Sequence, residues 1–269
     1  VAGSVPVATA GDAYPGIGAF DFVNTATGFA MFRKTLYRTD DGGQTWTPRL
    51  ALGRVSALSF PSVDRGWAVQ GRQLLEVVDG GGRVAATRPI PAGIQQIAFD
   101  EAAHGWLFGR HSAVAIQATG GTLTVFARPC AGFALGGAAA WSGTSLVGLC
   151  DPGPIDQERD ARAVQSGVAG SWPTEATLDV IVRSHGQSSD TPVPTPHQVT
   201  FVDRLHGWAV GDRAMFATVD GGRSWSTVFR PFGVTNLDAI DFVDNEHGFM
   251  SGFGGLYASA DGGRSWTKQ

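Results

Sequence analysis

The chain has 269 residues, of which 16% are charged, and a formal net charge of −4. This length allows one large domain or two small ones, and the modest charge does not indicate bulk attraction to nucleic acid. No run of 18 apolar residues occurs, so no membrane-spanning helix is expected. The 38 glycines separate short runs rich in Val, Ile, Phe and Thr, a composition typical of short strands and tight turns.

The ends and the cysteines suggest a location. The chain begins at Val1 and has no signal-peptide core, so we expect a mature form that has lost an export signal. Its two cysteines, Cys130 and Cys150, lie in one irregular segment at a separation that one hairpin could bridge. A disulfide between them would fit an extracytoplasmic protein, either secreted or associated with the cell envelope; two buried free thiols are the alternative.

A glycine followed by an aromatic residue recurs along the chain. Gly28, Gly66 and Gly105 are 38 and 39 residues apart, and Gly207 and Gly248 are 41 apart. An alternating apolar run precedes each glycine, and further short runs follow it, so each unit contains four short strands. Four strands with a period of about 40 residues indicate the blade of a β-propeller.

The sequence therefore predicts an all-β fold: a single β-propeller domain over residues 1–269, built from four-stranded antiparallel blades. The fourth blade is enlarged by the polar segment 151–162, and a Pro-rich connection at 184–196 follows it. We expect six blades; seven is the alternative if the N-terminal segment or residues 173–196 supply extra strands. The expected blades span approximately residues 17–50, 55–88, 94–128, 132–183, 197–230 and 236–269.

One phrase recurs between the third and fourth strands: TDDGGQTW, TVDGGRSW and SADGGRSW. It resembles the Asp-box, or bacterial neuraminidase repeat. We expect its aspartate to accept hydrogen bonds from turn N–H groups, its glycines to adopt positive φ, and its tryptophan to pack between sheets. The phrase is therefore interpreted as a structural turn rather than a binding site. The residues are Thr39, Asp41, Gly43 and Trp46; Thr218, Asp220, Gly222 and Trp225; and Ser259, Asp261, Gly263 and Trp266.

Two other repeat positions carry titratable residues. His104, His206 and His247 precede turn glycines in different blades, so they are interpreted as turn residues; no metal ion and no other cofactor is expected. Asp21 and Asp241 share a position on innermost strands. Ring closure would bring these two carboxylates together near the channel, as a functional pair or as ordinary polar residues.

Strand direction predicts two different faces. The first-to-second and third-to-fourth turns share one face, where aspartates gather, and the remaining loops share the opposite face, where arginines gather, Arg49 among them. We expect the arginine-rich face to bind a partner; the alternative is that these charges only decorate loops. The predicted binding residues are Arg33, Arg72, Arg110, Arg213 and Arg230.

Sialidases carry Asp-boxes, so that activity must be considered. The resemblance implies three arginines that bind the carboxylate of the sugar, a Tyr–Glu pair that supplies the nucleophile and an Asp that acts as acid/base. A tyrosine nucleophile is a recognised exception among glycosidases. Tyr37 and Tyr257 occupy repeat positions, and Tyr14 lies in the N-terminal arm. The Phe-Arg-Ile-Pro motif is absent. No catalytic residue is assigned, and a noncatalytic protein is favoured over a sialidase-type enzyme.

The stretch VTFVDRLHGWAVGDRAMFATVDGGRSW, residues 199–225, resembles blades of the photosystem II stability/assembly factor-like propellers. Blades one to three and six follow the same layout, and residues 130–196 do not. The resemblance implies a noncatalytic exported scaffold that binds another protein as an assembly or stability factor. We expect a monomer and no nucleic-acid partner. The alternative is a sialidase-like glycoside hydrolase or a lectin with a glycan ligand.

Overall fold

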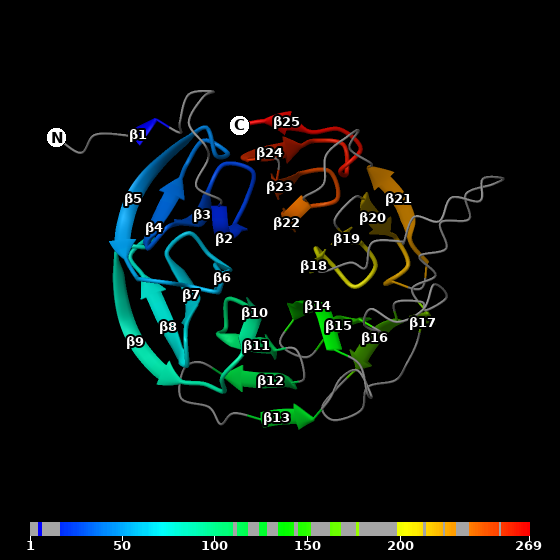
Figure 1. Ribbon diagram of the computed structural model, residues 1–269, viewed down its shortest axis with the longest axis horizontal. Helices are drawn as coiled ribbons and strands as arrows, with labels where there is room; N and C mark the ends of the chain where they lie inside the picture. Colours follow the sequence, from blue (N-terminus) through cyan, green and yellow to red (C-terminus); the bar gives the residue numbers. More distant parts are fainter. Residues whose placement is uncertain are drawn as a thin grey trace.

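The computed structural model is an all-β protein whose antiparallel sheets form a propeller around a central axis (Figure 1). The structure describes residues 5–6, 17–109, 112–117, 124–127, 134–142, 145–151, 162–167, 176–177, 198–211, 214–222, 224–229, 237–252 and 254–269. Within these residues the strands form six sheets, which we number 1 to 6 in chain order. The described part of the chain contains no helix with the length and apolar character that crossing a bilayer requires.

The strands of sheets 1 to 3 follow one another from the axis outward. Sheet 1 contains β2 (Ile17–Phe22), β3 (Gly28–Phe32), β4 (Thr35–Thr39) and β5 (Thr45–Ala51). Sheet 2 contains β6 (Ala57–Ser59), β7 (Arg65–Gln70), β8 (Gln73–Val78) and β9 (Arg83–Pro89). Sheet 3 contains β10 (Ile94–Phe99), β11 (His104–Gly109), β12 (Ser112–Gln117) and β13 (Thr124–Ala127).

Sheets 4 to 6 repeat this order. Sheet 4 contains β14 (Ala134–Ser142), β15 (Ser145–Asp151), β16 (Arg162–Gly167) and β17 (Ala176–Thr177). Sheet 5 contains β18 (Gln198–Phe201), β19 (Gly207–Gly211), β20 (Ala214–Thr218) and β21 (Ser226–Phe229). Sheet 6 contains β22 (Leu237–Phe242), β23 (Gly248–Gly252), β24 (Gly255–Ser259) and β25 (Thr267–Lys268).

The innermost strand of each sheet contacts that of the next, and β22 contacts β2, so the first and last sheets lie side by side (Figure 1). The short strand β1 (Val5–Pro6) pairs with β5 and adds a fifth strand at the outer edge of sheet 1. The choice between six and seven blades stays a prediction, because much of the chain between residues 127 and 198 lies outside the described residues.

The recurring glycine–aromatic pair is explained by packing between sheets. A Cβ on Gly66 would lie 2.4 Å from Cγ of Phe60, because that ring packs directly against the glycine. The same Phe60 ring stacks on Phe29 of sheet 1, with 3.7 Å between ring centroids. Each such phenylalanine therefore lies between the glycine of its own sheet and the aromatic residue of the preceding sheet. Among the described residues, three more pairs stack between neighbouring sheets in this way: Trp67–Phe99, Trp208–Phe242 and Phe249–Phe22.

The hydrophobic core is accordingly divided among the interfaces between sheets. One buried cluster joins Phe29 and Leu36 of sheet 1 to Phe60 and Leu75 of sheet 2. Another joins side chains of sheets 1 and 6, including Phe22. The Phe249–Phe22 stack, at 3.4 Å between centroids, lies where the ring closes without a covalent connection between the two sheets.

Candidate functional site

The Asp-box of sheet 1 is a turn held together by its own side chains. The Asp41 carboxylate accepts hydrogen bonds from Thr45 N at 2.8 Å, Thr45 Oγ1 at 2.6 Å and Thr39 Oγ1 at 2.8 Å. Thr39 Oγ1 in turn accepts Gly43 N at 2.9 Å, and Trp46 Nε1 donates to Gly43 O at 2.9 Å. Both oxygens of the carboxylate are therefore used inside the turn.

The other two boxes reproduce this arrangement. Asp220 accepts from the backbone and hydroxyl of Ser224, and Asp261 does the same from Ser265. The Ser265 hydroxyl, above all, lowers the pKa of Asp261 to about 2. Partial burial works to raise the pKa of Asp41, but hydrogen bonds from Thr45 and Thr39 outweigh it and lower the value. These hydrogen bonds therefore favour the charged form of Asp41 and Asp261.

The repeated histidines belong to the neighbouring turns on the same face. His206 Nδ1 lies 2.8 Å from Asp203 Oδ2, and His247 Nδ1 lies 2.9 Å from Asp244 Oδ2. The same aspartates accept the backbone N–H of their histidine. His104 makes a longer contact of 3.3 Å with Asp100. The three histidines thus lie apart, each beside its own aspartate: His206 and His247 directly precede a strand, and His104 is the first residue of β11.

The structure brings Asp21 and Asp241 together where sheets 6 and 1 meet. Asp241 Oδ2 accepts the Phe22 N–H at 2.6 Å, and Asp21 Oδ2 accepts the Phe60 N–H at 2.6 Å. Burial raises the pKa of Asp21 well above its usual value, and the charge of Asp241 raises it further. Burial also raises the pKa of Asp241 to about 6, against the hydrogen bonds from the N–H groups of Phe22 and Phe242.

These carboxylates are part of a repeated link between innermost strands. At three interfaces among the described residues, the residue before the phenylalanine of one sheet accepts the backbone N–H of the phenylalanine in the next sheet. Ser59 Oγ fills this role for Phe99 N at 3.0 Å, where Asp21 and Asp241 use a carboxylate. An uncharged hydroxyl can therefore supply the same link, so the ring does not require the charge of Asp21 and Asp241.

The opposite face carries exposed basic residues. Arg33 and Lys34 form the β3–β4 turn, Arg72 lies in the β7–β8 turn and Arg54 lies in the connection between sheets 1 and 2, all exposed. None of the ion pairs found among the described residues involves these four side chains. Asp238, exposed at the start of β22, is an acidic residue near the same face. We call Arg33, Lys34, Arg54 and Arg72 the arginine face.

The sequence placed Arg49 on the arginine face, and that assignment is wrong. Arg49 Nε donates to Gly80 O and Nη2 to Asp79 O, both at 2.9 Å. These carbonyls belong to the β8–β9 turn, on the Asp-box side of the molecule. The long side chain reaches across to the neighbouring sheet, which strand position alone does not reveal.

Several residues singled out in the sequence lie outside the described residues: Arg110, Arg213, Arg230, Cys130 and Tyr14. The proposed disulfide is therefore not tested. Tyr37 and Tyr257 lie in the third strands β4 and β24. Tyr37 packs edge-on against Phe32, with 5.1 Å between ring centroids.

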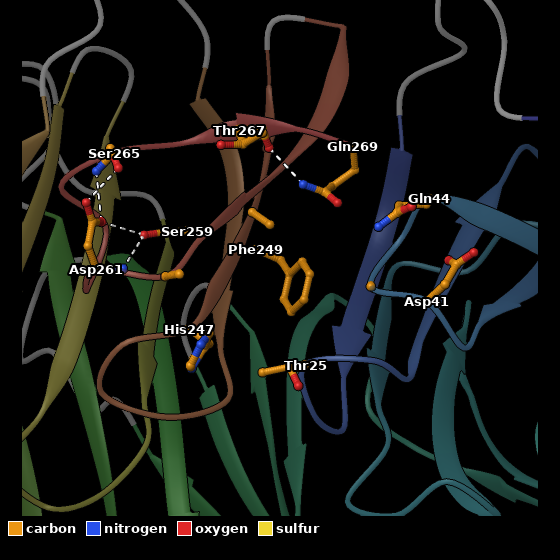
Figure 2. Close-up of a pocket in the computed structure, with 13 residues that line it drawn as sticks. Thr25, Asp41, Gln44, His247, Phe249, Ser259, Asp261, Ser265, Thr267 and Gln269 are labelled. Atoms are coloured by element: carbon orange, nitrogen blue, oxygen red, sulfur yellow. Dashed lines mark hydrogen bonds between the residues drawn. The ribbon is translucent and has the colours of Figure 1, made fainter.

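The sequence did not suggest a pocket between sheets 6 and 1. This pocket of about 390 Å³ lies on the Asp-box side. Thr25, Asp41 and Gln44 line it from sheet 1, and Phe249 and Gln269 line it from sheet 6 (Figure 2). One feature of the sequence could have revealed this pocket: when the repeats are aligned, sheet 6 has Gln269 where sheet 1 has Arg49.

Residues 37–48 match the BNR/Asp-box repeat family. The chain contains a BNR/Asp-box repeat. The sequence matches no curated protein, so the remaining comparisons rest on structure.

The solved structures with the same fold are distant in sequence. YCF48 bound to a D1 peptide is 16% identical with a TM-score of 0.58, covering 99% of this chain and 84% of that one. YCF48 from Cyanidioschyzon merolae is 17% identical with a TM-score of 0.58, covering 98% and 87%. The GH74 enzyme of Niastella koreensis is 14% identical with a TM-score of 0.57, covering 93% of this chain and 46% of that one. At these identities the likeness shows the propeller fold.

Proposed function

We propose that this chain is a noncatalytic, exported propeller scaffold that binds another protein through its arginine face, as an assembly or stability factor. The observation that carries the proposal is the difference between the two faces. The carboxylates of the three Asp-boxes are used inside their turns, whereas Arg33, Lys34, Arg54 and Arg72 are exposed in loops. Guanidinium groups in such loops suit carboxylates of a partner chain.

The backbone at Arg33 supports this proposal. Arg33 has a φ of 57° in the β3–β4 turn, a conformation that costs a non-glycine residue about 1 kcal/mol. The corresponding first position of the β7–β8 turn is Gly71, with a φ of 61°. An arginine that occupies a position better suited to glycine suggests a use outside the fold.

Charge reversal tests the proposal. Bait protein carrying Arg33→Glu with Arg72→Glu is compared with natural bait in a pull-down from the envelope fraction of the source organism. A partner captured by the natural chain should be captured at least about tenfold less by the variant. The matched control reverses Asp64 and Glu101, exposed on the Asp-box side, and should leave capture unchanged. Equal capture by natural and arginine-reversed bait would contradict the proposal.

A glycoside hydrolase is the second candidate, favoured by one observation. The carboxylates of Asp21 and Asp241 interact with each other, and their pKa values are raised, as a general acid requires. A panel of fluorogenic glycosides, including sialosides, tests this directly. Turnover that disappears in both Asp21→Asn and Asp241→Asn would establish the enzyme and overturn the noncatalytic proposal.

A further inference from the structure

The interface between sheets 1 and 2 is closed on the Asp-box side by arginines of sheet 1. Arg49 bridges the carbonyl oxygens of Asp79 and Gly80, each at 2.9 Å. Arg38 lies beside it, with its guanidinium carbon 5.8 Å from the centroid of the Phe29 ring. A planar guanidinium suits two neighbouring carbonyls and an aromatic face, because its N–H groups diverge in one plane.

The interface between sheets 6 and 1 has the same acceptors without these donors. The repeats align Asp41 and Gly42 with Asp79 and Gly80. On the other side, Ala258 pairs with Phe249 just as Arg38 pairs with Phe29. Gln269 follows Lys268, the partner of Tyr257, and so occupies the place of Arg49. Gln269 Nε2 donates to Thr267 O, within its own sheet, at 3.0 Å.

The interface between sheets 5 and 6 satisfies the same carbonyl in another way. Trp208 Nε1 donates to Gly262 O at 3.0 Å, and Gly262 aligns with Gly42 and Gly80. At the sheet 6–sheet 1 interface the residue aligned with Trp208 is Phe249, which has no N–H in its ring. Among the described residues, no hydrogen bond reaches the carbonyl oxygens of Asp41 or Gly42 across this interface.

The pocket of about 390 Å³ lies at this point. Its lining includes the carboxylates Asp41 and Asp261, and none of the described residues that line it is a lysine or an arginine. Figure 2 shows the Phe249 ring between the sheet 1 residues Asp41 and Thr25 and the sheet 6 residues.

We propose that the sheet 6–sheet 1 pocket binds the guanidinium group of an arginine side chain from a partner protein. The bound group would donate to the carbonyl oxygens of Asp41 and Gly42, as Arg49 does to the equivalent carbonyls one interface away. Phe249 lines the apolar wall, as Phe29 does beside Arg38. This site is on the opposite side from the arginine face and does not depend on the proposed function.

An exchange of the two aligned residues tests the proposal. The blocked peptide acetyl-Gly-Arg-Gly-amide is titrated into the natural chain and followed by backbone amide NMR, with citrulline and lysine peptides as controls. The arginine peptide should bind at one site, shift the amides of Gly42 and Phe249, and bind at least about tenfold more tightly than the citrulline peptide, which lacks the charge. Gln269→Arg should remove this binding, because the chain then supplies its own guanidinium.

The reciprocal variant Arg49→Gln makes the sheet 1–sheet 2 interface resemble the pocket. It should create a second site, with peptide-dependent shifts at Gly80, and so remains informative if Gln269→Arg does not fold. Arg72→Glu, on the arginine face, should leave peptide binding unchanged whether or not that face binds a partner. Absence of saturable binding to the natural chain, equal binding of the citrulline peptide, or unchanged binding to folded Gln269→Arg would each overturn the proposal.

Discussion

The sheet 1–sheet 2 and sheet 6–sheet 1 interfaces share the contacts made by their inner strands, here called the inner contacts. They differ farther from the axis, at the turns on the Asp-box side, here called the outer end of each interface. Both have a stacked aromatic pair, Phe29–Phe60 in one and Phe249–Phe22 in the other. Both have an aspartate that accepts an N–H of the next innermost strand. Arginines occupy the outer end of the first interface, and a pocket occupies that of the second.

The comparison distinguishes two groups of residues: those of the inner contacts, which recur at these interfaces and close the ring, and those on the Asp-box side, which differ from one interface to the next. The inner contacts recur because every pair of neighbouring sheets must bury the same kind of apolar surface. On the Asp-box side the donor to the turn carbonyls of the next sheet varies: Arg49 supplies it at one interface and Trp208 at another, whereas Gln269 donates within its own sheet. Function can therefore change at one interface while the fold remains intact.

Removing an inner contact should have the largest effect. Phe22→Ala deletes the ring that stacks on Phe249 and should lower the free energy of unfolding by about 3–5 kcal/mol, as measured by urea denaturation. Phe60→Ala removes the equivalent ring from the sheet 1–sheet 2 interface. We expect it to cost less, because Arg49 and the chain connection also hold that interface. If Phe22→Ala lowered the free energy of unfolding less than Phe60→Ala, the inner contacts would not be the main interactions that hold sheets 6 and 1 together.

The Asp-box turns should have the next largest effect. Asp41→Ala leaves Thr45 N, Thr45 Oγ1 and Thr39 Oγ1 without their acceptor and should cost about 1–3 kcal/mol of unfolding free energy. The matched change Asp40→Ala removes one exposed ion pair with Arg38 and should cost at most about 1 kcal/mol. Equal losses in thermal or urea unfolding would show that the box hydrogen bonds do not hold the turn.

The Asp241 carboxylate should make stability depend on pH. Its pKa is about 6 in the fold, above the ordinary value of 3.8, so the folded state holds the proton more tightly than the unfolded chain. Its stabilising contribution is complete below about pH 4 and is lost as the pH rises through about 6. Asp241→Asn keeps an acceptor for the Phe22 N–H without the charge.

Comparison with this variant isolates the effect. Asp241→Asn should be more stable than the natural chain by about 1–3 kcal/mol at pH 8, and the difference should shrink towards pH 4. Urea titrations at several pH values measure it. An asparagine variant that is equally destabilised at every pH would contradict the assignment of the raised pKa to this carboxylate.

The smallest effects concern the arginines. Arg49→Gln removes two hydrogen bonds to backbone carbonyls and should cost about 1 kcal/mol. Arg33→Gly relieves a positive φ and should raise the unfolding free energy by up to about 1 kcal/mol, while weakening capture of a partner by the arginine face. Differential scanning calorimetry of both variants checks the signs. If Arg49→Gln stabilised the fold, the hydrogen bonds of Arg49 would not hold the sheet 1–sheet 2 interface. If Arg33→Gly destabilised it, the positive φ of Arg33 would not be a strained conformation.

Local patterns were enough to predict the repeat and the form of the Asp-box turn, because the turn hydrogen bonds join residues four or fewer positions apart. Ring closure correctly predicted that Asp21 and Asp241 approach each other. Their actual acceptor role was missed, because it depends on the N–H of a neighbouring innermost strand.

Contacts between sheets were not predictable in the same way. The sequence could not show that Gly66 makes room for Phe60 or that Arg49 reaches the carbonyls of another sheet. The first contact lies within sheet 2 and depends on the orientation of the Phe60 ring, and the second depends on how closely neighbouring sheets approach. The pocket required a comparison of aligned residues, Arg49 with Gln269, in the light of contacts that only the structure supplies.

The most direct test of the difference between the interfaces is a crystal structure of the Gln269→Arg variant. The introduced guanidinium should donate to the carbonyl oxygens of Asp41 and Gly42 with N···O distances near the 2.9 Å that Arg49 makes with Asp79 and Gly80, and should fill the pocket beside Phe249. A side chain at position 269 that points into solvent, with the pocket still open, would contradict the equivalence of the two interfaces.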